Sequence, residues 1–226
     1  EYLAALESLP ELMRERMLNG VWRGNEGAVY PEFDEDTHVV EPFEIPADWR
    51  RLRSIDFGYT NPFVCLWGAL DGDGRLYVHR ERYKASERTA EHAKEILRLS
   101  GEERYFVSVA DHDAAERAEL DSAGIRTEAA RKDVATGIQA VKGRLATQAD
   151  GRPRLLFFKT LKHTLSEIYE YRWEARREGV NAKEEPVKLN DHAMDALRYM
   201  VMAVDKPAKE AFRGESAPRA SDGRWS

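Results

Sequence analysis

The chain has 226 residues, enough for a full hydrophobic core, and its hydrophobic content of 42% is typical of globular proteins. Its formal net charge of -6 argues against coating nucleic acid by bulk positive charge, yet allows a nuclease whose acidic site binds cations. No apolar run approaches the roughly 20 residues of a membrane-spanning helix, and the single cysteine, Cys65, excludes an intramolecular disulfide, so we expect a soluble intracellular protein.

The N-terminal part of the sequence differs in pattern from the rest. Apolar residues at helical spacing predict a short helical pair over residues 1–20. Residues 21–49 combine glycine, proline and acids with scattered aromatics, which predicts an ordered arm that crosses a surface. We therefore assign residues 1–49 to a helical segment and arm, and residues 50–205 to the main domain. Residues 206–226 contain few apolar groups and are predicted to be a disordered tail.

The main domain begins with three apolar segments rich in β-forming residues, at 52–59, 63–70 and 76–83. The glycines of the turn 71–74 supply the positive φ that tight hairpins need, so these segments predict an antiparallel meander. Strands are then expected at 105–110, 125–128 and 155–158, alternating with helices at 87–99, 114–123, 134–147, 161–177 and 191–204. This order predicts an α/β fold with a mixed sheet flanked by helices.

The first two candidate site residues are acids at the ends of predicted strands. Asp56 lies late in the first strand and precedes Gly58, which lets the chain leave the strand without a side chain crowding the carboxylate. The alternative is that Asp56 has no ligand and serves only to initiate the turn. Asp111 ends the apolar strand 105–110, where ligands of α/β sheets usually bind. The alternative is that an acid here caps the next helix, and Asp113 is the better candidate for that role.

The most informative segment is 190–199, on the last predicted helix. Asp191 and Asp195 lie one turn apart at the edge of its apolar stripe, beside Arg198. Two like charges at this spacing repel each other, so they favour a compensating cation. Asp191 is also explained as the N-terminal cap of the helix, whereas Asp195, in the second turn, has no capping role.

Asp56, Asp111 and Asp195 together suggest a metal site that hydrolyses phosphodiesters. Oxygen ligands without a cage of cysteine or histidine favour Mg²⁺ or Mn²⁺, and two such ions can cleave a phosphodiester without a nucleophilic side chain. Candidate DNA contacts are the basic pairs Arg131-Lys132 and Lys142-Arg144. In a chain that is 34% charged, such pairs are more often solvated surface.

Several of these motifs occur together in one known family. They are Asp-Phe-Gly at 56–58, Asp111, Lys-Asp at 132–133, Gly-Ile at 137–138, Tyr-Arg-Trp at 171–173, Asp-His-Ala-Met-Asp-Ala-Leu-Arg-Tyr at 191–199, and the arm 27–49. In content and order they resemble the nuclease domain of the terminase large subunits of tailed bacteriophages, over residues 20–205. The last helix and the overall order are the specific part of this resemblance.

The resemblance implies a ribonuclease-H-like fold and a two-metal endonuclease that cleaves double-stranded, concatemeric viral DNA during genome packaging. Asp56, Asp111 and Asp195 match the acids that hold the ions, Mg²⁺ or Mn²⁺. His192 matches a histidine near the metals, Asp191 matches an accessory ligand or a cap, and Lys132 lies where a basic residue near the DNA is expected.

In that family the arm follows an ATPase motor domain, and the partners are double-stranded DNA, that motor, the small terminase subunit and the portal protein. The implied location is the host cytoplasm, at the procapsid, with no membrane. The sequence lacks the G-x-x-x-x-G-K-[ST] phosphate loop of such a motor, so ATP-driven translocation is not assigned to this chain.

Three other classes of protein share part of the pattern. A resolvase or transposase of the same fold would carry the same acids. Residues 56–60 also fit the phosphate loop of actin-like ATPases, which need a second such loop that the sequence lacks. A non-catalytic module that docks on DNA or a portal would not be stabilised by metal ions, whereas a metal-dependent nuclease would be.

Overall fold

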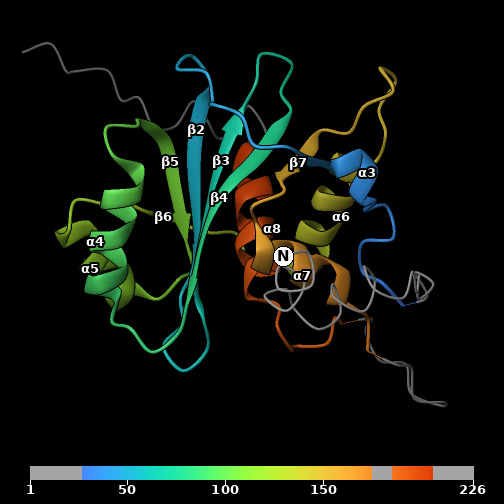
Figure 1. Cartoon of the computed structure of the whole chain (residues 1–226). Coiled ribbons are helices and arrows are strands. Elements are labelled where there is room, and N and C mark those ends of the chain that lie inside the picture. The colour runs from blue at the N-terminus through green and yellow to red at the C-terminus, as the bar shows by residue number, and fades with distance from the viewer. Residues whose placement is uncertain (1–26, 175–184, 206–226) are drawn as a thin grey trace, which may run out of the picture.

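In the computed structural model, the described residues are 27–174 and 185–205, and they form a sheet with helices on both faces (Figure 1). The predicted helical pair at 1–20 and the predicted tail at 206–226 lie outside the described residues. The strands are β1 (Val39–Val40), β2 (Arg50–Asp56), β3 (Phe63–Leu70), β4 (Leu76–Lys84), β5 (Tyr105–Ala110), β6 (Glu128–Ala129) and β7 (Leu155–Phe158). The helices are α3 (Glu35–His38), α4 (Thr89–Ser100), α5 (Ala114–Ser122), α6 (Val134–Leu145), α7 (Lys162–Glu170) and α8 (His192–Val204).

The predicted antiparallel meander is confirmed. β3 pairs antiparallel with β2 and with β4. In the hairpin between β3 and β4, the Asp71 carboxylate accepts hydrogen bonds from the backbone N–H of Asp73 and Arg75, and Gly74 takes a φ of 77°. The glycine is needed here because that φ is unfavourable for other residues.

The other strand pairs are parallel, and this brings most strand ends together. The order across the sheet is β1-β7-β4-β3-β2-β5-β6, and among the described strands only β3 runs in the opposite direction. The carboxyl ends of β2, β4 and β5 therefore lie along one edge of the sheet, which we call the carboxyl edge. Ligands of such sheets bind at this kind of edge.

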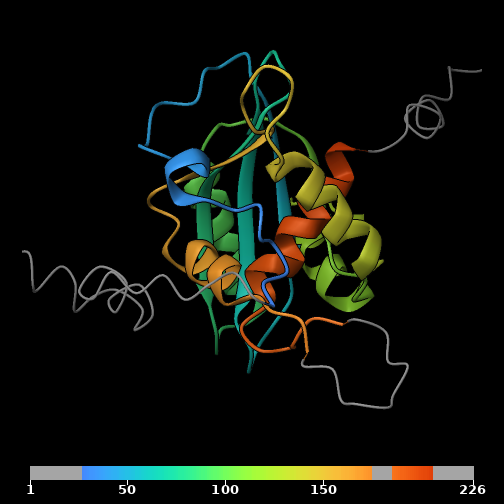
Figure 2. The same cartoon turned by 90° about the vertical axis from the view of Figure 1, so that its right-hand side faces the viewer.

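Helices cover the two faces of the sheet as separate layers. α4 and α5 lie on one face, while α6, α7 and α8 lie on the other, with α8 crossing in front of the sheet (Figure 1 and Figure 2). Met194, Leu197 and Met200 of α8 are fully buried in the largest hydrophobic cluster of the core. Gly68 of β3 permits this close packing, because a Cβ atom there would lie 2.7 Å from the Met200 sulfur.

Most predicted elements occur at nearly their predicted positions, and the exceptions involve contacts distant in sequence. The strand predicted at 125–128 is the two-residue β6, and the helix predicted at 161–177 ends at Glu170. It ends there because the chain continues in extended form, where Arg172 bridges to Ala28 and Trp173 to Pro186.

The arm does more than cross the surface, because part of it joins the core. Val29, Tyr30 and Phe33 are buried, and β1 adds a parallel strand to β7. The sequence pattern did not predict α3 or β1. Among the described residues, no helix is both long and apolar enough to cross a membrane.

Candidate metal centre

Asp56 is the last residue of β2 and lies at the carboxyl edge, with only 6% of its surface exposed. Burial raises the pKa of its carboxyl group to about 6, because the charged form loses hydration. The chain then turns sharply at Gly58, where a Cβ atom would lie 2.5 Å from the backbone oxygens of Asn61 and Pro62. A glycine is therefore required for the turn that follows this acid.

His192 begins α8 and contacts Asp56 directly. Its Nδ1 atom lies 3.1 Å from Oδ2 of Asp56. This contact raises the pKa of His192, and the same hydrogen bond lowers the pKa of Asp56 by less than burial raises it. The pair connects the end of β2 to the start of α8 across 136 positions of the sequence.

Asp195 lies one turn into α8 and is held by a buried arginine. Arg198, only 4% exposed, places its Nη2 atom 2.6 Å from Oδ1 of Asp195 and donates through Nη1 to the Tyr171 hydroxyl at 2.8 Å. Burial raises the pKa of Asp195, although the charge of Arg198 opposes this. The negative charge of Asp195 in turn raises the pKa of Asp56, as does that of Asp111.

Asp111 follows β5, beside the end of β2, where its backbone N–H donates to the Ile55 carbonyl at 3.1 Å. Its carboxylate forms an ion pair with Lys132 and accepts the backbone N–H of His112. The cap of α5 is Asp113, whose side chain accepts the backbone N–H of Ala115 and Glu116. The capping role considered for Asp111 therefore belongs to Asp113.

The N-terminus of α8 is capped by a residue that the sequence analysis missed. Asp191 occupies the N-cap position, but its side chain makes no capping hydrogen bond. Instead Glu167 of α7, 3% exposed, accepts the backbone N–H of Ala193 at 2.6 Å and of Met194 at 3.3 Å. A charged residue within the buried face of α7 was the only signal in the sequence that pointed to this role.

Burial raises the pKa of Glu167 to about 7. Hydrogen bonds from Tyr83 and the helix amides, together with the nearby His192, lower it by less. Glu167 therefore supports the first turn of α8, on which both His192 and Asp195 depend.

The donor set fits a hard divalent cation by its chemistry, since it offers three carboxylates and one imidazole. As placed here, however, no three histidine, cysteine, aspartate or glutamate side chains of the described residues are grouped to hold an ion. Each of the three main predicted acids instead has a basic partner: Lys132 for Asp111, Arg198 for Asp195 and His192 for Asp56. The structure therefore places these acids at one edge, already charge-compensated, without a preformed coordination shell.

The structure separates the predicted DNA-binding residues into two groups. Lys132 lies at the centre, through its ion pair with Asp111, and the adjacent Arg131 is exposed. Lys142 lies 3.9 Å from a carboxylate oxygen of Glu32. Arg144 bonds to Asp205 at 2.6 Å and to the Gly74 carbonyl of the β3–β4 hairpin, at the edge opposite Asp56. Lys142 and Arg144 are thus not brought to the acids.

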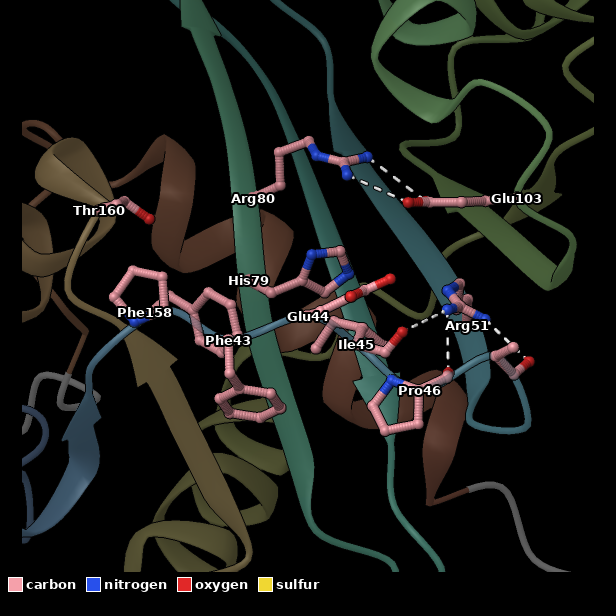
Figure 3. Close-up of a pocket in the computed structure, with 12 residues that line it drawn as sticks. Phe43, Glu44, Ile45, Pro46, Arg51, His79, Arg80, Glu103, Phe158 and Thr160 are labelled. Atoms are coloured by element: carbon pink, nitrogen blue, oxygen red, sulfur yellow. Dashed lines mark hydrogen bonds and ion pairs between the residues drawn. The ribbon is translucent and has the colours of Figure 1, made fainter.

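A separate pocket of about 720 Å³ lies between the arm and β4 (Figure 3). Arg51 fastens the arm by donating to the carbonyls of Ile45 and Pro46, and Arg80 pairs with Glu103 across the pocket. Burial lowers the pKa of His79 to about 4, so this imidazole is neutral at physiological pH. The pocket contains none of the predicted metal ligands.

Comparison with solved structures identifies the fold. A large terminase from a thermophilic bacteriophage, which we call the thermophilic large terminase, matches with 25% identity and a TM-score of 0.70, covering 88% of this chain and 51% of that one. The nuclease domain of the P22 large terminase matches with 21% identity and a TM-score of 0.64, covering 78% and 92%. The large terminase nuclease of another thermophilic phage, G20c, with bound magnesium matches with 17% identity and a TM-score of 0.56, covering 77% and 96%.

No protein-family model and no curated protein matches the chain. The structural matches confirm the resemblance to phage large terminases and the predicted ribonuclease-H-like fold. The chain spans about half the length of the thermophilic large terminase.

Proposed function

We propose that this chain is the nuclease part of a phage DNA-packaging terminase, and that it cleaves double-stranded, concatemeric DNA with the help of divalent metal ions. The observation that carries the proposal is that Asp56, Asp111 and Asp195 lie along the carboxyl edge of a terminase-nuclease fold, near enough for their charges to influence one another. The three acids come from β2, the end of β5 and α8, and the charges of the other two raise the pKa of Asp56.

In this proposal Asp56, Asp111 and Asp195 hold Mg²⁺ or Mn²⁺, as two ions, with Asp191 as an accessory ligand and His192 beside them. Bound ions of this kind supply an activated water and stabilise the departing oxygen. The magnesium-bound and cobalt-bound nuclease structures of G20c support the use of divalent ions.

The neighbouring side chains position the proposed ligands. His192 orients the Asp56 carboxylate through its Nδ1 contact, and Arg198 fixes Asp195. Lys132 compensates the charge of Asp111 and lies close enough to the acids to contact a phosphate of bound DNA.

The proposed partners follow from the same likeness. They are double-stranded DNA, an ATPase motor to which residues 1–49 connect, a small terminase subunit and a portal protein, at a procapsid in the host cytoplasm. The match to the thermophilic large terminase supports the proposed motor partner, because only 51% of that protein aligns with this chain and the rest of it is a further part.

A plasmid-nicking assay tests the proposed activity. Supercoiled DNA should be cleaved in Mg²⁺ and Mn²⁺, while Ca²⁺ should bind without supporting cleavage, because its larger and variable coordination aligns water and leaving oxygen poorly. Asp56→Asn and Asp195→Asn should reduce cleavage to the level seen with EDTA, while Asp48→Asn, a change at an exposed aspartate of the arm, should not. Asp191→Asn should have a milder effect.

Two outcomes would contradict the proposal: undiminished cleavage in EDTA, or normal cleavage by both the Asp56 and Asp195 variants. A thermal melt with Mn²⁺ provides an independent measurement, because an ion that binds only the folded state raises Tm. The same Tm with and without Mn²⁺ would favour a non-catalytic docking module.

A further inference from the structure

Two large apolar side chains are unusually exposed beside the candidate metal centre. Among the described residues, the most exposed large hydrophobic side chains are Leu189 at 69% and Tyr59 at 62%. Tyr59 lies three positions after Asp56, and Leu189 lies three positions before His192. Exposed apolar groups with polar surroundings often mark an interaction surface.

The Tyr59 side chain is carried by a tightly fixed turn, which joins β2 to β3 (Figure 1). Gly58 packs so closely against Asn61 and Pro62 that it has no room for a Cβ atom, and the Tyr59 carbonyl accepts the backbone N–H of Ser86 at 2.7 Å. Ser86 itself takes a positive φ of 63°, which is uncommon for a residue other than glycine. The backbone is therefore held in place while the ring stays exposed.

Two cations flank this turn. Lys84 ends β4, opposite Phe63 in the register, and Arg88 precedes α4, so the two lie on either side of Ser86. Both side chains are exposed, and within residues 27–174 and 185–205 neither forms an ion pair. Their positive charge is thus available to an anionic ligand at the carboxyl edge.

Other exposed aromatic residues have partners in the fold, which sets Tyr59 apart. Phe43 packs edge-on against Trp49 and Tyr77. Phe106 lies under the Arg50 guanidinium, 4.1 Å from the ring centroid to Cζ. Its place near the start of β5 is at the edge opposite the acids, which makes Phe106 a suitable control residue.

We propose that Lys84, Arg88, Tyr59 and Leu189 form a DNA-gripping rim of the nuclease site. Lys84 and Arg88 bind backbone phosphates, while Tyr59 and Leu189 contact sugars and base edges in the minor groove, where apolar side chains commonly insert. This assignment rests on the proposed nuclease function and identifies duplex DNA as the ligand. The phosphate and sugar contacts carry no direct sequence information.

Steady-state cleavage of a duplex oligonucleotide in Mn²⁺ tests the role of the ring. Tyr59→Ala should raise KM about tenfold and leave kcat within about twofold, since contacts in the minor groove contribute to binding rather than to the reaction. Tyr59→Phe should retain the wild-type KM because it keeps the ring. Phe106→Ala, which removes an exposed aromatic residue at the opposite edge, should behave like the wild type.

The salt dependence of KM tests the two cations. Removing both with Lys84→Ala and Arg88→Ala should lower the slope of log KM against log salt by about 2, because about one counterion is released per phosphate contact. The control is the double variant Arg104→Ala and Arg152→Ala, which removes two exposed cations next to β5 and β7 at the opposite edge. Its slope should match that of the wild type.

The outcomes separate this inference from the proposed function. A wild-type protein that shows no divalent-dependent cleavage would refute the nuclease itself. A cleaving wild type whose KM is unchanged by Tyr59→Ala, or equally changed by Phe106→Ala, would refute the rim. A fall in kcat at unchanged KM would also refute it, since the residue would then act on the acids and not on DNA. Thermal melts with Mn²⁺ should show the same Tm increase for all these variants.

Discussion

Replacing Glu167 with glutamine tests how a buried acid supports α8. The carboxylate is almost fully buried and accepts the first amide groups of the helix, Ala193 at 2.6 Å and Met194 at 3.3 Å. Burial raises its pKa from the ordinary value of 4.5 to about 7. Glutamine has nearly the same shape and can still accept a hydrogen bond, but it never carries a charge.

The sign and size of the effect follow from proton linkage. Between pH 4.5 and about 7 the folded state holds a proton on Glu167 that the unfolded state has lost, so the wild type loses stability as pH rises through this window. A shift of about 2.5 pH units corresponds to about 3 kcal/mol, at about 1.4 kcal/mol per unit. The variant lacks this loss, so its stability relative to the wild type should rise by about 3 kcal/mol between pH 4 and pH 8.

Urea denaturation of both proteins across this pH range measures the difference. Any constant cost of the altered cap cancels, because only the change of the difference with pH is compared. Glu170→Gln, on the same helix, removes the same charge from a partly buried position and serves as the control for net charge. Parallel stability curves for wild type and Glu167→Gln would show that burial does not govern this acid.

Three further predictions concern the turn, the ion pair and the predicted DNA contacts. Gly58→Ala should abolish cleavage and lower Tm, because the new Cβ atom would lie 2.5 Å from the Asn61 carbonyl oxygen; a fully active variant would contradict this. Lys132→Met should tighten Mn²⁺ binding about threefold in calorimetry, since it removes a cation that competes for Asp111, and weaker binding would show that Lys132 helps to build the site. Arg144→Ala should cost about 2 kcal/mol in urea denaturation without changing DNA affinity, because its guanidinium is already bonded within the fold; a weakened DNA complex would reinstate it as a contact.

The order of strands and helices was predictable because it depends on local pattern. Short apolar segments rich in β-forming residues and the glycine turn at 71–74 mark the meander without knowledge of any distant contact. The pairing of β1 with β7 was not predictable in this way. It joins Val39 to Phe157, and two residues are too few to show a period.

The candidate site was predictable only in part, for a similar reason. Asp195 stands out because no capping role explains it, and Asp56 stands out because it ends an apolar strand, although a turn-initiating role was open for it. The sequence analysis considered Asp191 as either the cap or an accessory ligand, because sequence rules for capping consider only the residues beside a helix. The structure uses Glu167 from another helix, and the choice depends on how α7 packs against α8, which no local window contains.

α8 contributes both to the hydrophobic core and to the three acids of the candidate metal centre, and this determines when cleavage can begin. Its residues Met194, Leu197 and Met200 fill the core, while Asp195 and His192 complete the edge begun by Asp56. A ribosome that has made β2 and β5 has therefore produced only two of the three acids, on a sheet whose face is still uncovered. On the proposed function, a chain whose synthesis has not passed α8 cannot cut DNA, because hydrolysis must wait until this helix has been made and has docked.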